Sequence, residues 1–343
     1  MDINLFDFPL PEDLIAQKPA DKRDHSRLLA VNYGEKTLKD EHFYEIIKYF
    51  HKGDVLVRNN TKVIPARLLG IKEKTGAHCE LLLLKQIIND DWECLCRPAK
   101  SLKIGSRVIF GDGELIAECI EEKNEGLRVF RFIYQGIFLE VLDKLGKMPL
   151  PPYIKKQITT NDRYQTVYAK LEGSAAAPTA GFHFTDDIFE ELKKIGVQIV
   201  DITLHIGLGT FRPVQVTDTK DHLMHSELYE ISESSSVILN AAKESKKRII
   251  AVGTTTVRTL EANYSKYGIF KPTRESTNIF IQPGYKFKVV DALVTNFHLP
   301  KSTLLMLVSA FMDRDFALLA YQHAVDKKYR FFSFGDAMFI YGK

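Results

Sequence analysis

Cysteines, long apolar runs and an excess of either charge are all scarce in this sequence. Four cysteines among 343 residues are too few for the disulfide frameworks of small secreted domains. The longest apolar run, residues 304–312, includes Ser309 and is far too short to cross a bilayer. No basic segment followed by an apolar run begins the sequence, so we expect no signal peptide and predict a cytoplasmic protein without a membrane partner.

The charges nearly balance, with 47 Lys and Arg against 44 Asp and Glu and a formal net charge of +3. A nucleic-acid or phosphate partner is therefore allowed but not required, because such binding depends on a local patch. With 45% hydrophobic and 27% charged residues, the composition is that of a globular protein. The length predicts two domains.

Two regions differ in how their secondary-structure signals are spaced. Between about residues 64 and 150, short alternating or apolar runs are separated by turn signals, which is typical of a small antiparallel barrel or sandwich. After about residue 153, strands alternate with helices, which indicates an α/β layer around a buried sheet. Strands are predicted at 54–58, 197–206, 248–252 and 292–297, and helices at 42–51, 136–145, 254–267 and 302–312. The pattern favours a β domain inserted into, or docked beside, an α/β domain.

The most informative segment is 178–185 (PTAGFHFT), which directly precedes a predicted helix. Its small residues allow close backbone approach to a ligand, and a histidine such as His183 can titrate near neutral pH. Thr185 is the expected N-cap of the helix. We therefore expect this loop to bring His183 to a ligand site, with Thr179 and Gly181 beside the substrate.

The predicted strand 197–206 places His205 near its end and continues into the glycine-rich loop 207–213 (GLGTFRP). A strand that ends in such a loop is where open α/β sheets bind ligands. The loop is not a dinucleotide fingerprint, because Arg212 stands where the third glycine belongs. A tight turn with a surface arginine explains it equally well.

Two later strands also end in polar residues. Gly253 and three threonines begin the helix after the strand at 248–252, and they offer N–H groups and hydroxyls to an anion or carboxylate. The simpler alternative is a threonine cap with one helical ion pair between Arg258 and Glu261. After the strand at 292–297, Asn296 and His298 lie at the same predicted edge, although His298 alone could be a structural histidine.

The segment 225–231 (HSELYEI) alternates, so His225, Glu227 and Tyr229 share one face of a predicted strand. This row could bind a ribose or supply a general acid or base. From the segment alone, a solvated strand face is favoured, because antiparallel strands commonly have one wet face.

The cysteines do not predict a metal site. Their positions, 79, 94, 96 and 119, do not have the spacing of zinc ligands. We expect small core residues there instead.

Together, these segments closely resemble the S-adenosylmethionine:tRNA ribosyltransferase-isomerase family of queuosine biosynthesis. The resemblance runs nearly end to end, and its other segments are 14–17, 23–29, 59–67, 162–169 and 329–337. So many long, ordered motifs make it highly specific. The sequence departs from the family pattern at Asn60, where Asp is usual, and at Phe182, Thr256 and Phe334, where Leu, Ser and Tyr are usual. Only Asn60 changes the charge, so it removes an acid that the family pattern has.

The resemblance implies a mixed α/β domain, residues 1–63 and 153–343, with an inserted small antiparallel β-barrel domain, residues 64–152. It also implies the reaction. The ribosyl part of S-adenosylmethionine moves to the amine of a 7-aminomethyl-7-deazaguanine at the tRNA wobble position and rearranges, giving epoxyqueuosine and releasing adenine and methionine. S-adenosylmethionine is then a substrate, with no separate cofactor and no metal, and tRNA is the macromolecular partner.

That reaction needs a base near C5′ of the ribose, an acid for the departing adenine and exclusion of water. His183 is the leading candidate for the acid or base, and further candidates are His205, His225, Glu227 and His298. Thr254, Thr255 and Arg258 are expected to hold the methionine carboxylate. The remaining expected substrate contacts are Thr179, Gly181, Gly207, Gly209, Arg212 and Asn296.

Basic residues in the resembling segments are candidates for tRNA phosphate contacts, although solvated surface charge explains each one about equally well. They are Arg27, Lys62 and Arg67, with Lys155 and Lys156.

Two other functions compete with ribosyl transfer. A non-catalytic RNA-binding protein would need basic and aromatic surface, but not histidine-bearing loops at several strand ends. An S-adenosylmethionine-dependent methyltransferase would leave S-adenosylhomocysteine and usually has a G-x-G loop after its first strand, where this sequence has residues 58–61 (RNNT). We expect release of adenine to separate ribosyl transfer from both.

Overall fold

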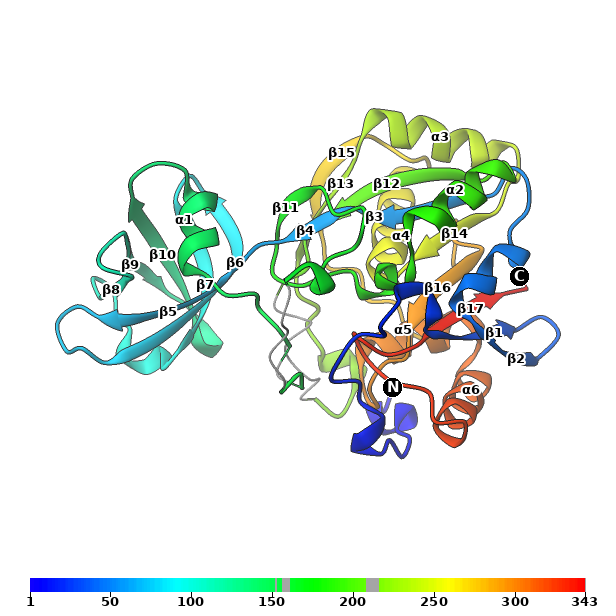
Figure 1. The fold of residues 1–343 in the computed structure, drawn as a ribbon, viewed down its shortest axis with the longest axis horizontal. Helices are drawn as coiled ribbons and strands as arrows, with labels where there is room; N and C mark the ends of the chain where they lie inside the picture. The colour runs from blue at the N-terminus through cyan, green and yellow to red at the C-terminus, as the bar shows by residue number, and fades with distance from the viewer. Residues whose placement is uncertain (152, 156–160, 208–215, 343) are drawn as a thin grey trace.

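The chain folds into an α/β domain and a smaller β-barrel, which Figure 1 shows as a separate lobe. The computed structural model describes all residues except 152, 156–160, 208–215 and 343. The arrangement confirms the predicted fold class, an α/β domain with a small antiparallel barrel. None of the described helices is long and apolar enough to cross a membrane.

The α/β domain is built on a nine-stranded sheet in the order β15-β13-β12-β3-β14-β16-β17-β1-β2. Its centre, from β12 to β16, is parallel, whereas β13, β15, β17 and β2 introduce antiparallel pairs. The strands are β1 (Arg27–Asn32), β2 (Thr37–His42), β3 (Val55–Asn59), β12 (Gln198–Leu204), β13 (Glu227–Ile231), β14 (Ile249–Val252), β15 (Thr273–Thr277), β16 (Ala292–Asn296) and β17 (Ala337–Tyr341).

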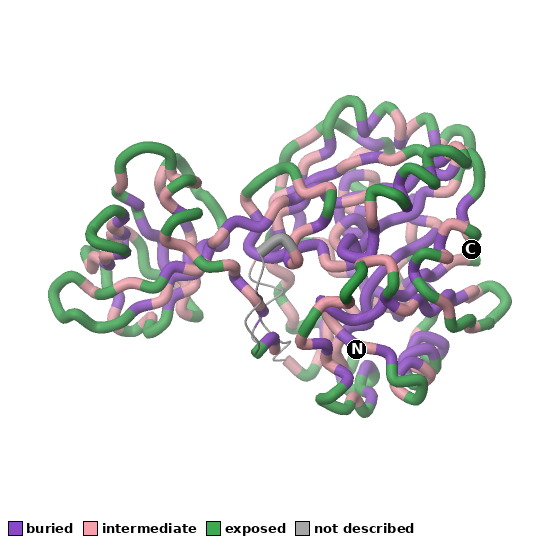
Figure 2. The backbone as a smooth tube through the Cα atoms, viewed as in Figure 1, coloured by how far each residue is buried: buried purple, intermediate pink, exposed green. Residues whose placement is uncertain are grey.

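Helices cover both faces of this sheet, and each face has its own apolar core. One core joins the sheet to α3 (Glu233–Glu244), α4 (Thr254–Tyr267), α5 (Thr303–Met312) and α6 (Arg314–Asp326). The other joins it to α2 (Asp186–Lys194) and the 3-10 helix η4 (Phe43–Tyr49). Because successive strand residues point to opposite faces and both faces are covered, β14 and β16 are buried at every position, and the centre of the domain is largely buried in Figure 2.

Local sequence signals explain where several helices begin. The Thr185 hydroxyl accepts the backbone N–H of Ile188 and thereby caps α2, as predicted. Ser302 caps α5 in the same way through the N–H of Leu305. The helix predicted at 42–51 is instead the shorter 3-10 helix η4.

The barrel is closed by six antiparallel strands in the order β10-β7-β6-β5-β8-β9. They are β5 (Arg67–Lys72), β6 (His78–Ile88), β7 (Asp91–Arg97), β8 (Arg107–Phe110), β9 (Leu115–Glu122) and β10 (Leu127–Tyr134), and α1 (Phe138–Leu145) follows them. All four cysteines lie in its core, which confirms that they are small core residues. Burial raises the pKa of their thiols, that of Cys96 to about 12, so they are poor nucleophiles.

The chain enters the barrel after β4 (Thr61–Val63), and it later forms β11 (Leu171–Ser174), which pairs with β4 in parallel. Where the chain leaves the barrel, Lys147 exchanges backbone hydrogen bonds with Arg67. Both connections between the barrel and the α/β domain therefore run close together.

The solvated face favoured for 225–231 is wrong. Glu227, Tyr229 and Ile231 are all buried, because β13 lies between β12 and β15 and its inner face belongs to the α/β core. His225 precedes the strand. The polar residue on this face is therefore held inside the protein, where it needs a partner.

Candidate active site

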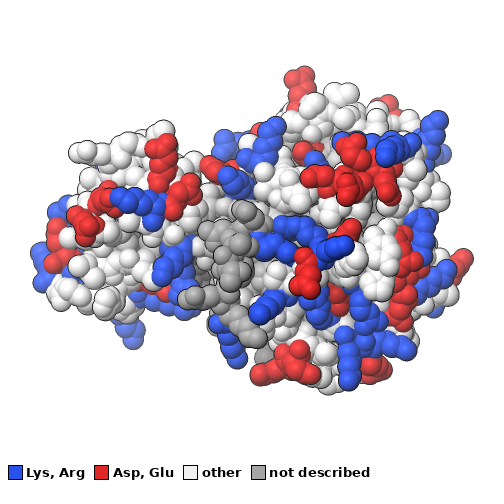
Figure 3. Space-filling model, in the orientation of Figure 1, with Lys and Arg blue, Asp and Glu red and all other residues white. Residues whose placement is uncertain are grey.

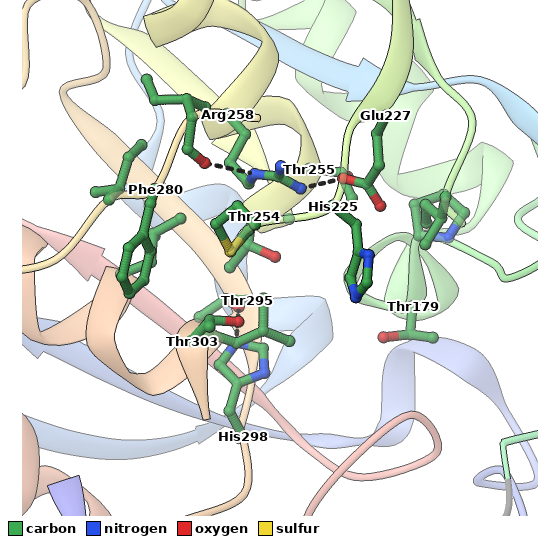
Figure 4. A pocket seen from close by; sticks show the side chains of 18 of the residues that line it. Thr179, His225, Glu227, Thr254, Thr255, Arg258, Phe280, Thr295, His298 and Thr303 are labelled. Atoms are coloured by element: carbon green, nitrogen blue, oxygen red, sulfur yellow. Dashed lines mark hydrogen bonds and ion pairs between the residues drawn. The ribbon is translucent and has the colours of Figure 1, made fainter. Parts of the chain in front are cut away.

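A cavity of about 600 Å³ opens where β14 and β16 end and where α4 and α5 begin (Figure 4). Its volume is in the range of small-molecule sites, and its position is the one at which open α/β sheets bind ligands. Glu125 and Leu127 of the barrel also contribute to the lining. The candidate residues that line it are Thr179, His225, Glu227, Thr254, Thr255, Arg258, Asn296 and His298.

The start of α4 forms one wall of the cavity. Gly253 has φ +86°, a conformation that favours glycine, and it directs the chain from β14 into the helix. Thr254 and Thr255 then line the cavity, whereas the Thr256 hydroxyl donates back to the Val252 carbonyl at 2.7 Å. The first turn therefore offers N–H groups and two hydroxyl-bearing residues to a ligand.

Arg258 and Glu227 form a buried ion pair beside that turn, with side chains 9% and 6% exposed. The guanidinium also donates through Nε to the carbonyl of Ile279 at 3.3 Å. Its Nη2 is buried and has no acceptor among the described residues. Since an unsatisfied buried donor is costly, this nitrogen marks a place where an anionic ligand would be stabilised.

The predicted helical ion pair between Arg258 and Glu261 is wrong. Glu261 is fully buried, and its carboxylate accepts the backbone N–H groups of 288–290 and the hydroxyl of Tyr285. Arg258 instead pairs with Glu227 from β13. Glu261 thus anchors the segment before β16, and Arg258 is directed to the cavity.

His225 and His298 bring imidazole groups to the cavity lining. Figure 4 shows His225 near Thr179 and the Arg258–Glu227 pair, with His298 across the pocket. Burial lowers the pKa of His298 to about 3, and its Nε2 lies 2.8 Å from the Thr295 hydroxyl. His298 is therefore neutral near pH 7. His225 is half-buried, so of the two rings it is the more accessible to a substrate.

The structure does not bring His183 into the lining of this cavity. Its Nδ1 lies 2.7 Å from the Ser26 hydroxyl and its Nε2 lies 3.0 Å from the Asn296 amide nitrogen. Because the Asn296 oxygen accepts from Thr179, its nitrogen donates to Nε2, and Nδ1–H donates to Ser26. Burial, with Arg330 and Arg23 nearby, lowers the pKa of His183 to about 3. His183 therefore reaches the cavity only through Asn296, as a positioning residue.

His205 also lies outside the lining. Its Nδ1 is 2.8 Å from the Thr61 hydroxyl, and burial, with Arg274 nearby, lowers its pKa to about 4. Gly173 packs against the ring, since a Cβ at this glycine would lie 3.1 Å from it. His205 thus joins β11 and β12 at the domain junction.

The glycines that were predicted to contact the substrate lie in different environments. A Cβ at Gly181 would lie 2.0 Å from the Tyr168 hydroxyl oxygen, so this position requires glycine for packing against Tyr168. Gly207 lies at the cavity end of β12, and its N–H donates to Glu227 at 3.3 Å. Gly209 and Arg212 lie outside the described residues.

Three of the predicted tRNA contacts, Arg27, Lys62 and Arg67, are engaged with carboxylates. Arg27 lies over the Tyr329 ring at 3.7 Å and pairs with Asp40. Lys62 pairs with Glu172 and Arg67 with Glu80, each at 2.8 Å. Binding to a phosphate would require these pairs to open. Lys155 is exposed, and Lys156 lies outside the described residues.

Several lining residues were missed from the sequence, including His222 and a group of apolar and aromatic side chains. Burial, with His225 nearby, lowers the pKa of His222. The others come from distant segments: Tyr153, Tyr164, Met224, Ile279, Phe280, Ile281 and Phe332. No local pattern brings these positions together, because they converge only in the folded chain. Among the described residues, no cluster of three His, Cys, Asp or Glu could hold a metal ion.

Comparisons with known proteins agree with this arrangement. The family model described as queuosine biosynthesis protein matches residues 3–340. The crystal structure of S-adenosylmethionine tRNA ribosyltransferase from Thermotoga maritima is 38% identical, with 98% of this chain and 99% of that chain covered and a TM-score of 0.55. The resemblance found in the sequence is thereby confirmed, and the chain belongs to the queuosine biosynthesis protein family.

Proposed function

We propose that this protein transfers the ribosyl part of S-adenosylmethionine to the amine of 7-aminomethyl-7-deazaguanine at the wobble position of tRNA. The transferred ribose rearranges to an epoxycyclopentane, which gives epoxyqueuosine, and adenine and methionine leave. The chain is then a ribosyltransferase-isomerase. S-adenosylmethionine is consumed as a substrate, and the scheme uses no metal or separate cofactor.

The unpartnered Nη2 of Arg258 carries this proposal. It is buried in Arg258, which lines the cavity beside the N-terminus of α4, where N–H groups favour an anion. A carboxylate is the only anionic group of S-adenosylmethionine, so its methionine end fits this wall. The apolar and aromatic side chains Met224, Ile281 and Phe280 line the same cavity and suit the flat surface of adenine.

The proton transfers require a group that touches the substrate. We assign the general acid or base role to His225, because it lines the cavity and is accessible, whereas Glu227 is held by Arg258. His298 is neutral near pH 7 because its pKa is about 3, so it accepts or donates a hydrogen bond without carrying charge. His183 orients Asn296 from behind.

The test is incubation of the purified protein with S-adenosylmethionine and an anticodon stem-loop that carries the aminomethyl-deazaguanine, followed by mass spectrometry. Epoxyqueuosine in the RNA, with free adenine and methionine, is the expected result. A stem-loop with guanine at the wobble position is the control and should remain unmodified. Formation of S-adenosylhomocysteine, or binding of both substrates without release of adenine, would contradict the proposal.

A further inference from the structure

Phe332 is held in a backbone conformation that a bulky aromatic residue rarely adopts. Its φ is +75°, in the left-handed region that favours glycine, and an aromatic side chain there is an outlier. The residue is half-buried and lines the large cavity. Backbone strain of this kind persists where the surrounding structure imposes it, and it is concentrated at ligand sites.

The turn that carries Phe332 is fixed on both sides. The Phe332 N–H donates to the carbonyl of Phe297 at 3.0 Å, and the Phe332 carbonyl accepts the N–H of Gly335 at 2.9 Å. Phe331, which precedes it, is fully buried in the α/β core. Gly335 allows the chain to turn this tightly, because a Cβ there would clash with the carbonyl oxygen of Arg330. The backbone therefore holds Phe332 at the cavity, beside the end of β16.

Tyr153 forms an aromatic corner with Phe332. The two ring centroids are 4.1 Å apart, and the ring planes are at 72°. The hydroxyl groups of Tyr153 and Ser333 are hydrogen-bonded, and the Tyr153 carbonyl accepts the Gln17 amide at 2.9 Å, so the protein itself positions this ring. Both aromatic residues line the cavity. Two nearly perpendicular rings offer a flat surface and an edge, which suits a planar heterocycle.

The aromatic corner and the wall proposed for adenine lie on opposite sides of the cavity. Phe280 directly follows the residue whose carbonyl accepts from Arg258, so the adenine wall adjoins the proposed carboxylate site. Tyr153 packs against an apolar cluster that contains both ends of the segment 177–182. This segment carries Thr179, which Figure 4 shows across the pocket from Phe280. The cavity therefore has two aromatic surfaces with space between them.

We propose that Phe332 and Tyr153 form the stacking site for the wobble nucleobase of the RNA substrate. The RNA itself is supplied by the proposed function, on which this inference rests. Because the ribosyl group leaves adenine and joins the amine of a second heterocycle, the two heterocycles must flank the ribose. Two aromatic surfaces on opposite sides of one cavity match this requirement.

The physical cost of bringing the base into the cavity favours an aromatic site. A nucleobase must leave its stack in the RNA to enter an enzyme pocket, and aromatic side chains replace the stacking that it loses. The RNA backbone stays outside, where it needs positive charge. Figure 3 shows Lys and Arg side chains gathered near the centre of this face of the α/β domain.

The test compares two anticodon stem-loops, one with the aminomethyl-deazaguanine at the wobble position and one with an abasic site there. Binding is measured without S-adenosylmethionine, so that no turnover occurs. The wild type should bind the first RNA about 5- to 150-fold more tightly, as expected for one stacked base. Phe332→Gly should remove most of this preference and leave the affinity for the abasic RNA unchanged.

The variants separate loss of the ring from relief of backbone strain. Glycine accommodates the positive φ of residue 332, which offsets part of the lost packing, so Phe332→Gly should fold. Phe332→Asn is a second variant without the ring, because asparagine also tolerates this conformation. Lys246→Gly is the matched control: Lys246 has φ +52°, is exposed after α3 and is not among the lining residues. It should retain the full preference for the base.

The dissociation constant of S-adenosylmethionine assigns the two aromatic surfaces. Phe280→Leu should raise it and keep the preference for the base, whereas Phe332→Gly should leave it unchanged. An equal rise in both variants would assign the corner to adenine and overturn the proposal. Full preference for the base in Phe332→Gly and Phe332→Asn, or no preference in the wild type, would also overturn it.

These outcomes are distinct from failure of the proposed function. Loss of the base preference in Phe332→Gly, with no epoxyqueuosine formed by the wild type, would refute the reaction and leave the base site standing. Formation of epoxyqueuosine by Phe332→Gly with the wild-type KM for RNA would refute only the base site.

Discussion

Replacement of Arg258 together with its partner Glu227 tests whether this pair recognises the carboxylate of S-adenosylmethionine. The single change Arg258→Met would leave the Glu227 carboxylate buried and unpaired, which costs about 3–5 kcal/mol of folding stability. The double variant Arg258→Met/Glu227→Gln removes both charges and avoids that cost. It should therefore fold with nearly the stability of the wild type, and thermal unfolding checks this first.

The expected loss of affinity follows from the geometry of the guanidinium. Two of its nitrogens are engaged by Ile279 and Glu227, and Nη2 is buried without an acceptor among the described residues. A hydrogen bond to a charged group contributes about 1.5–3 kcal/mol, so the dissociation constant of S-adenosylmethionine should rise by about 10- to 150-fold. The α4 N-terminus still favours an anion, so binding should weaken without being abolished.

Titration calorimetry with S-adenosylmethionine and its decarboxylated analogue separates recognition from general damage to the cavity. The analogue should bind the double variant at least as well as it binds the wild type, because it has no carboxylate to lose a partner. Equal losses for both ligands would refute the reasoning and make the ion pair purely structural.

Three further predictions concern the histidines and the loop 178–185. His225→Gln should lower the rate of adenine release at least about 100-fold. His183→Gln should lower it by less than about 10-fold, because glutamine can still form hydrogen bonds with the neighbours of His183. The reverse order would return the acid–base role to His183. The pKa of His183 and of His298 is about 3 in the folded protein but near 6.5 when unfolded. The free energy of unfolding should therefore be full above pH 6.5 and fall as pH drops towards 3, by about 2 kcal/mol per histidine between pH 7 and pH 5. Urea unfolding of the wild type and His183→Gln measures this difference, and identical pH slopes would contradict it. Gly181→Ala should destabilise the protein by about 1–3 kcal/mol, because the new Cβ would meet the Tyr168 hydroxyl. Adding Tyr168→Phe removes that hydroxyl and should restore part of the lost stability, which thermal unfolding measures. No restoration would show that this contact is not the cause.

Much of the fold could be predicted because its signals are local. Helix α4 spans Thr254–Tyr267, as predicted, since Gly253 and Gly268 mark its two ends. The alternating runs and turn signals of the barrel likewise report strand periodicity and hairpins. The strand ends that bear Asn296 and Thr254 were predicted to meet at one sheet edge, and they do line one cavity.

What could not be predicted depends on contacts between distant segments. A glutamate three residues from Arg258 gives a helical pair on spacing alone, and only the placement of β13 beside the cavity shows that Glu227 is the partner. Likewise, the motif around His183 could not predict the hydrogen bond between its ring and Ser26, because Ser26 belongs to the distant N-terminal segment.

The position of β1 in the sheet has a consequence for how the chain folds during synthesis. β1 pairs on one side with β2 and on the other with β17, at residues 337–341. At 5–20 residues per second, a ribosome needs roughly 15–60 s after β2 to complete β17. Throughout that interval the hairpin of β1 and β2 has no partner in the sheet, and it must wait with an open strand edge that is prone to mispairing. The N-terminal hairpin, which is synthesised first, therefore joins the sheet only after the C-terminal strand β17 has been made.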